Sequence, residues 1–165
     1  KVVGRYVAKS TRPRIPKEEE MSEANIALLR RAWAAYDQGD EEEFAACLTP
    51  DWKEYGSPNA SSYGTLEVER QTMREHRIAF PDKHTEIHMI LADENTVACF
   101  CTVTAKHSGK YLDVEPTGKI VIVHEMMFNR VRDGKICETY AMAAGTGFYE
   151  QITGKKIPEQ LDNLA

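Results

Sequence analysis

The spacing of hydrophobic and polar positions changes near residue 83 and divides the chain into a helical part and a strand-rich part. Between residues 22 and 80, apolar residues recur at intervals of three and four, as in amphipathic helices. After residue 83 they form shorter runs bounded by turn residues, as in β-strands. The pattern predicts an α+β fold, in which three helices cover one face of a curved, mostly antiparallel sheet.

Three segments have helical spacing. The first is capped by Ser22 and ends at Gly39, the second is capped by Asp40 and runs through Leu48, and the third follows Thr65 from residue 66 to residue 80. The first two are joined by a short turn, so we expect an αα-hairpin laid across the sheet. Trp33 and Phe44 are its expected core anchors.

Strands are expected where hydrophobic runs end at turn residues, at residues 85–91, 96–106, 119–131 and 135–144. The last two runs are joined by Asp133-Gly134, a dipeptide that tolerates positive φ and suits a tight hairpin. A short final helix over residues 148–152 is predicted, with Gly154 past its end.

The composition fits a single globular domain. The chain has 165 residues, of which 42% are hydrophobic and 28% charged. We divide it into a basic N-terminal extension (1–20), the α+β domain (21–154) and a C-terminal tail (155–165). Four apolar side chains of the extension are expected to hold it against a neighbouring surface: Val2, Val3, Tyr6 and Val7.

Charge and hydropathy exclude two classes of partner. The net charge of -5 argues against a nucleic-acid surface, which needs clustered Lys and Arg in excess. No apolar run approaches the roughly 20 residues of a membrane-spanning helix, and no secretory signal is recognisable. We therefore expect a cytoplasmic protein that binds neither nucleic acid nor a membrane.

Cysteine and histidine do not form a metal-binding pattern. The thiols of Cys47, Cys99, Cys101 and Cys137 lie in apolar contexts without Cys-x-x-Cys spacing, which favours buried thiols. The five histidines are scattered along the chain. We expect no metal site.

Several short motifs follow one another in a characteristic order. They are Trp33, Pro50-Asp51-Trp52, Phe80-Pro81-Asp82, Thr104 with His107-Ser108-Gly109, Pro116 to Lys119, Arg130 to Ile136, and Glu138 with Gly147 and Gln151. In this order, residues 22–154 resemble the SnoaL-like polyketide cyclase and ester-cyclase family. The resemblance implies a cone-shaped α+β barrel. It also implies a cofactor-independent enzyme that closes a ring, isomerises or hydrates a small apolar carbonyl compound by acid/base chemistry.

The resemblance also assigns catalytic positions. The family aspartate on the last strand falls on Ala144 and a family histidine falls on Tyr55, so neither titratable group is present. His107 keeps its match and is the candidate acid, base or hydrogen-bond donor, because imidazole titrates near neutrality. The alternative for His107 is a solvated loop position.

Strand alternation adds further candidates. If Glu125 faces inward with Val121, Val123 and Met127, burial raises its proton affinity, as a general base requires; the alternative is an outward ion pair. Tyr140, Met142 and Ala144 share one strand face and are the expected cavity wall. Tyr55 and Tyr63 are candidate hydrogen-bond donors to a ligand carbonyl.

Two functions compete at this point. The first is the cyclase-type enzyme with a relocated acid/base; the second is a non-catalytic module that binds an apolar ligand or oligomerises. Ala144 and Tyr55 favour the second, and His107 favours the first. The outward residues of one strand are the expected interface of a homo-oligomer, a dimer or tetramer: Ile120, Ile122, Met126 and Phe128.

Overall fold

The computed structural model describes residues 18–56 and 64–155. In chain order the elements are α1 (Glu18–Gln38), α2 (Glu41–Cys47), β1 (Leu48–Tyr55), β2 (Gly64–Thr65), α3 (Leu66–Ala79), β3 (His84–Ala92), β4 (Thr96–Lys106), β5 (Ile120–Arg132), β6 (Lys135–Ala144) and α4 (Phe148–Thr153). The side chains expected to anchor the N-terminal extension, Val2, Val3, Tyr6 and Val7, lie outside these residues.

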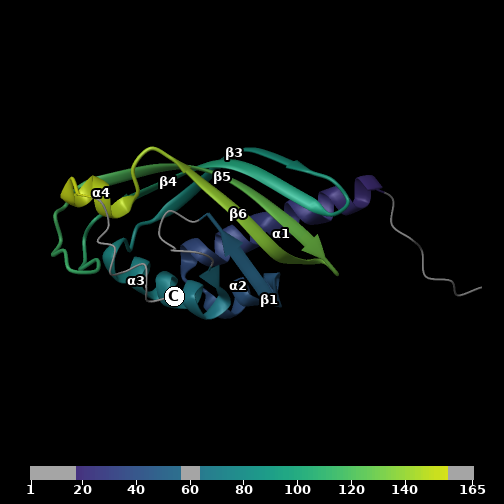
Figure 1. Ribbon diagram of the computed structural model, residues 1–165, viewed down its shortest axis with the longest axis horizontal. Helices are drawn as coiled ribbons and strands as arrows, with labels where there is room; N and C mark the ends of the chain where they lie inside the picture. Colours follow the sequence, from purple (N-terminus) through teal and green to yellow (C-terminus); the bar gives the residue numbers. More distant parts are fainter. Residues whose placement is uncertain (1–17, 57–63, 156–165) are drawn as a thin grey trace, which may run out of the picture.

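The strands form one six-stranded curved sheet in the order β2-β1-β6-β5-β4-β3. All neighbours pair antiparallel except β1 and β6, which run parallel. In Figure 1 the sheet arches over α1, α2 and α3, and α4 lies at one end. The expected α+β architecture, with helices in the hollow of a curved sheet, is confirmed.

Local capping explains where several elements begin and end. The Asp40 carboxylate accepts from the Glu43 N–H at 3.0 Å, and the Thr65 hydroxyl accepts from the Val68 N–H at 3.4 Å, which satisfies free amides at the starts of α2 and α3. The β5–β6 turn has positive φ at Asp133 and Gly134, as predicted.

Two features differ from the sequence-based expectations. α1 begins at Glu18, so Ser22 lies within the helix and does not cap it. The parallel pairing of β1 with β6 was not expected, because hydrophobic alternation reports a strand's faces and not its partner.

The inward face of the sheet alternates with an outward face along β5. Val121, Val123, Met127 and Asn129 are buried, whereas the residues between them are exposed or less buried. The buried residues belong to two apolar clusters, one under α1 and α2 and one near α4. A cavity extends between these clusters.

Candidate functional site

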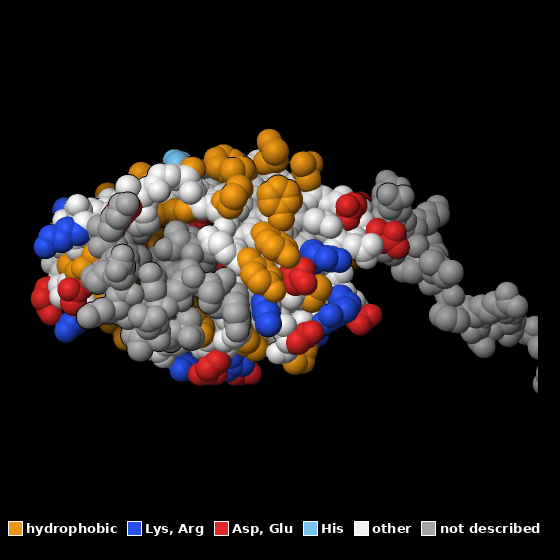
Figure 2. Space-filling model, viewed as in Figure 1, with side chains coloured by type: hydrophobic (Ala, Val, Ile, Leu, Met, Phe, Trp, Pro, Cys, Tyr) orange, Lys and Arg blue, Asp and Glu red, His pale blue; other side chains and the backbone are white. Residues whose placement is uncertain are grey.

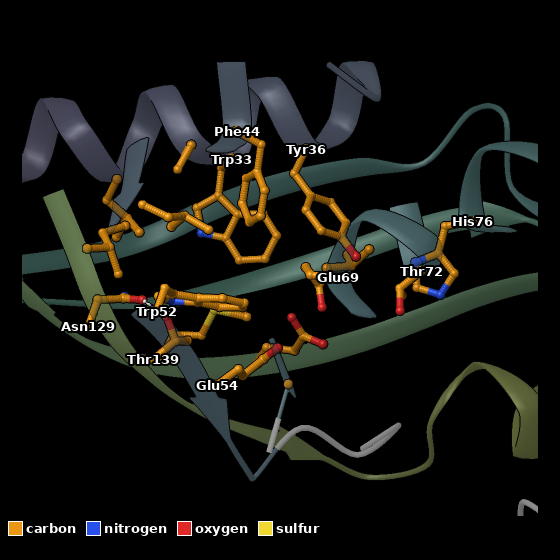
Figure 3. A pocket seen from close by; sticks show the side chains of 18 of the residues that line it. Trp33, Tyr36, Phe44, Trp52, Glu54, Glu69, Thr72, His76, Asn129 and Thr139 are labelled. Carbon is orange, nitrogen blue, oxygen red and sulfur yellow. Dashed lines mark hydrogen bonds between the residues drawn. The ribbon is translucent and has the colours of Figure 1, made fainter. Parts of the chain in front are cut away.

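A cavity of about 120 Å³ lies between the helices and the concave face of the sheet. One end is apolar and aromatic, with side chains from α1, α2 and β1 (Figure 3). Trp33, Tyr36, Phe44 and Trp52 form a chain of edge-to-face rings there, with successive centroids 5.8, 5.3 and 6.4 Å apart. This end is suited to the apolar body of a ligand.

Three carboxyl groups line the same cavity: Glu54 from β1, Glu69 from α3 and Glu125 from β5. Figure 3 shows Glu54 and Glu69 pointing toward each other, with the Tyr36 hydroxyl beside Glu69. Burial and the proximity of Glu69 both raise the pKa of the Tyr36 phenol. The polar part of the cavity is therefore an acidic cluster enclosed by aromatic rings.

Burial raises the pKa of each of these carboxyl groups. For Glu125 burial raises the pKa to about 7, with the positive charge of Lys83 acting against the rise and the charge of Glu69 adding to it. Burial, then Glu69 and Glu125, hold the pKa of Glu54 well above its ordinary value. Burial also raises the pKa of Glu69, opposed by Tyr36 and Lys83.

The Glu54 and Glu69 carboxyl groups point toward each other across the cavity (Figure 3). Two carboxylates at close range repel each other, so burial and the charge of Glu69 both favour the protonated form of Glu54. Near pH 7, Glu125 is close to half ionised. Such a cluster can both accept and supply protons.

The positive charge of Lys83 acts against burial to lower the pKa of two carboxyl groups in the cluster, Glu69 and Glu125. Its Nζ lies 2.8 Å from the Asp37 carboxylate and 4.2 Å from the centroid of the Tyr36 ring, and its side chain is only 7% exposed. Asp37 also accepts from the Thr85 N–H at 2.7 Å, which fixes its position. The charge of Lys83 favours the ionised forms of Glu69 and Glu125.

The aromatic end has a hydrogen-bonded polar chain behind it. Trp52 Nε1 donates to Thr139 Oγ1 at 3.0 Å, and Thr139 Oγ1 donates to Asn129 Oδ1 at 2.8 Å. Asn129 Nδ2 in turn donates to the Val97 carbonyl at 3.2 Å. Because these polar groups already have partners, this chain fixes the Trp52 indole.

The structure separates the two expected catalytic residues. Glu125 lines the cavity, as expected for its inward alternative, and Met127 lines the cavity as well. His107 is fully buried but is not among the cavity-lining residues. The two residues therefore do not meet in one site.

His107 instead connects a loop to the end of β4. Its Nδ1 accepts from the Thr117 N–H at 3.2 Å and lies 3.0 Å from Thr117 Oγ1, and its backbone bonds to Lys119 and Gly118. The ring packs on Phe80, with centroids 5.4 Å apart, and burial lowers its pKa. The solvated-loop alternative is wrong, because the ring is inaccessible.

The two faces of β6 are the reverse of those expected. Tyr140 and Met142 are 44% and 56% exposed and Ala144 is also exposed, so these residues lie on the convex face of the sheet. The alternation was read correctly, but the choice of inward face was wrong. The inward positions include Thr139 and Ala141, which carry no titratable group.

Of the two tyrosines proposed as ligand donors, Tyr55 is not among the cavity-lining residues. The Tyr55 ring stacks on Tyr140 with centroids 5.0 Å apart and an interplanar angle of 18°, which places it beside the convex face. Tyr63 lies outside the described residues.

Three cavity residues were not predicted from the sequence: Glu54, Glu69 and His76. For the two glutamates, the hydrophobic pattern of the sequence does contain a signal. Glu69 is three residues after Leu66 and four before Met73, so it lies on the apolar stripe of α3. Glu54 is two residues after the buried Trp52 on β1, so the two side chains lie on the same face of the strand. A carboxylate at an inward position of an amphipathic element is the pattern that would have identified both.

The convex face of the sheet carries a second notable surface. Its exposed apolar side chains come from β3 to β6 and gather over the sheet in Figure 2: Met89, Leu91, Phe100, Ile120, Ile122, Met126, Phe128, Tyr140 and Met142. Soluble monomers rarely expose apolar patches of this extent. Within the described ranges, no helix has the length and apolar character needed to cross a membrane.

Comparison with known proteins gives a consistent result. A family model described as SnoaL-like polyketide cyclase matches residues 26–152. A search of curated proteins found no match. Among solved structures, AclR of Streptomyces galilaeus, described as a proposed hydroxylase, is 29% identical, with a TM-score of 0.68 over 82% of this chain and 87% of its own.

Two further solved structures share the fold at lower identity. A proposed SnoaL-like polyketide cyclase from Jannaschia sp. is 16% identical, with a TM-score of 0.70 over 87% of this chain and 99% of its own. IdmH of Streptomyces antibioticus, a proposed polyketide cyclase, is 21% identical, with a TM-score of 0.64 over 78% of this chain and 95% of its own.

Proposed function

Because the chain belongs to the SnoaL-like polyketide cyclase family, we propose that it is a cofactor-independent enzyme that removes a proton beside a ligand carbonyl. The observation that carries the proposal is the cluster of three partly buried carboxyl groups in the aromatic cavity. The expected reaction is an aldol-type ring closure or a related isomerisation or hydration of a small, largely apolar carbonyl compound.

Glu125 is the proposed general base. Its carboxylate removes the proton from the carbon next to the carbonyl, and the electron pair moves onto the carbonyl oxygen to give an enolate. A pKa of about 7 places Glu125 where a base is both partly ionised and basic enough to act at neutral pH. Glu54, whose pKa is raised well above its ordinary value, is the proposed proton donor to the product.

The cluster also accounts for the residue at the assigned aspartate position. We propose that Ala144 replaces the family aspartate and that Glu54, Glu69 and Glu125 supply the acid/base groups in its place. An acidic side chain at the exposed Ala144 would point away from the cavity. The catalytic function would then have moved from β6 to β1, α3 and β5.

Deuterium uptake by acetophenone tests this function without knowledge of the natural substrate. The methyl protons of this single-ring ketone exchange when a base forms the enolate, and NMR follows the loss of their signal in D₂O. We expect exchange with the wild type and at least about 100-fold slower exchange with Glu125→Gln, because the base is lost. Glu67→Gln, on the exposed face of α3, is the matched control.

An enzyme that binds acetophenone without exchanging its protons would contradict the proposal. That result would instead favour the competing function, an apolar-ligand-binding module on the same fold. Equal exchange rates in Glu125→Gln and the control would remove Glu125 from the mechanism.

We also propose that the protein is a homo-oligomer, in the first instance a dimer, assembled through the convex sheet face. The continuous exposed apolar surface around Met126 and Phe128 supports this, since a second copy brings an equally apolar surface. We propose a cytoplasmic location as well. It is supported by the free thiols of Cys47, Cys99 and Cys101, which suit a reducing compartment, and cell fractionation tests it.

A further inference from the structure

His76 has an imidazole nitrogen without a partner in the wall of the cavity. The residue is 5% exposed, and among the described residues its Nδ1 has no hydrogen-bond partner. Its ring is held by Phe80, Tyr111 and Phe148, with centroid distances of 5.9, 5.6 and 5.3 Å. A buried polar atom without a partner is costly, so a ligand group that completes it would be favoured.

The contact with Tyr111 indicates which nitrogen carries the proton. Tyr111 is buried, and its hydroxyl lies 3.5 Å from His76 Nε2. Among the described residues, this nitrogen is the hydrogen-bond partner of the Tyr111 hydroxyl. A buried hydroxyl donates where an acceptor is available, so Nε2 accepts and Nδ1 bears the hydrogen. Burial and the charge of Lys83 lower the pKa of His76 to about 3, which keeps the ring neutral.

Most other donors of the cavity already have acceptors. Trp52 bonds to Thr139, Thr139 to Asn129, Thr72 to the Val68 carbonyl and Lys83 to Asp37. Within the described cavity wall, the ring nitrogens without any partner belong to His76 and Trp33, while the Lys83 ammonium has one acceptor among the described residues, Asp37, for its three N–H groups. Trp33 lies at the aromatic end, whereas His76 lies beyond Glu69 along α3 (Figure 3).

The position of Glu125 along β5 lies between the two apolar clusters of the core. On β5 it follows Val123 at the next inward position, roughly 7 Å along the strand. Val123 belongs to the apolar cluster that also contains the three rings around His76. Glu125 and His76 both line the same cavity.

We propose that His76 is a second catalytic residue, whose Nδ1–H donates a hydrogen bond to the ligand's carbonyl oxygen as Glu125 removes the neighbouring proton. The inference rests on the proposed function. The C–H electron pair becomes the C=C bond of the enolate, and the carbonyl pair moves to the oxygen. Glu125 gains the proton, and His76 stabilises the new charge without transferring its own hydrogen.

The binding of 4-nitrophenol tests this role. When this phenol gives its proton to the carboxylate cluster, the bound phenolate resembles the enolate and shows its own visible absorbance. We expect the wild type to bind it partly as phenolate. His76→Leu should bind about tenfold more weakly and lose the phenolate absorbance, because the donor is gone. His76→Asn places an amide N–H near the position of Nδ1 and should restore much of both signals.

Circular dichroism and thermal unfolding confirm that each variant is folded before it is compared. Nitrogen-15 NMR of the free wild type should find Nδ1 protonated. An unprotonated Nδ1, a wild type without phenolate absorbance, or a His76→Leu variant that matches the wild type would overturn the inference. Glu125→Gln separates the two proposals: if only this variant loses the phenolate signal, His76 is excluded and Glu125 stands, and the reverse result excludes Glu125.

Discussion

The carboxyl groups of Glu54 on β1 and Glu69 on α3 point toward each other inside the cavity (Figure 3). Burial and then the charge of Glu69 raise the pKa of Glu54, so the two act as a pair across the sheet and the helix. The charge of Glu69 also adds to the effect of burial in raising the pKa of Glu125. The electrostatics of the cavity therefore depend on three carboxyl groups acting together.

The partly buried carboxyl groups predict a stability that falls as the pH rises. Each has a folded-state pKa above its unfolded value, so its protonated form contributes stability that is complete below about pH 4 and is lost as pH rises through the folded pKa. For Glu125 the loss should be on the order of 1–3 kcal/mol between pH 5 and 8. Urea unfolding at both pH values should show it.

Glu125→Gln is the variant for that measurement. Glutamine stays neutral, so the free energy of unfolding should depend less on pH than in the wild type. Glu67→Gln, at an exposed position, should keep the wild-type dependence. Because the lowered pKa of His76 makes an opposite contribution over the same pH range, the comparison between variants is the test: equal pH dependences in Glu125→Gln and the wild type would contradict the raised pKa of Glu125.

His107 is expected to stabilise the protein without taking part in proton exchange. His107→Ala removes a fully buried ring that packs on Phe80 and bonds to Thr117, and should cost about 2–4 kcal/mol of unfolding free energy. The exchange rate of acetophenone per folded molecule should stay within about twofold of the wild type. A large loss of exchange in stably folded His107→Gln would return His107 to the active site.

The bond from Trp52 to Thr139 predicts a second stability effect. Thr139→Val keeps the shape of the side chain but leaves the indole N–H and the Asn129 carbonyl oxygen without this partner. The unfolding free energy should fall by roughly 1–3 kcal/mol, the cost of unsatisfied buried polar groups. Trp52→Phe in the Thr139→Val background should cost less than in the wild type; strict additivity would argue that the two residues act independently.

The convex sheet face predicts the oligomeric state. Light scattering after size exclusion should give a mass above that of one chain for the wild type, and a single-chain mass for Met126→Glu combined with Phe128→Glu, because charges would be buried against an apolar surface. Lys110→Glu is the control, because Lys110 is exposed but is not one of the apolar residues of the convex face. A monomeric wild type would exclude this interface.

Much of the fold follows from local signals in the sequence. The caps at Asp40 and Thr65 and the turn at Asp133-Gly134 depend on residues a few positions apart, which is why their elements were predicted closely. The parallel contact of β1 with β6 joins distant segments and left no local pattern.

The site was harder to predict because alternation gives two faces without saying which one is inward. Glu125 was placed through its apolar neighbours, and Met127 with it, whereas Tyr140 and Met142 were assigned to the wrong face because both faces of β6 contain apolar residues. Glu54 and Glu69 meet only through tertiary packing of β1 against α3. His107 matched a motif, but its burial behind Phe80 could not be read from that motif.

A carbon-13 NMR titration of the glutamate side-chain carboxyl groups measures the proposed base itself. With glutamate labelled at Cδ, and Glu125→Gln used to assign its signal, we expect Glu125 to titrate near pH 7 and Glu54 to remain protonated well above the ordinary glutamate range. Titration of every glutamate near pH 4 would exclude Glu125 as the base, because the cavity would then contain no base matched to neutral pH.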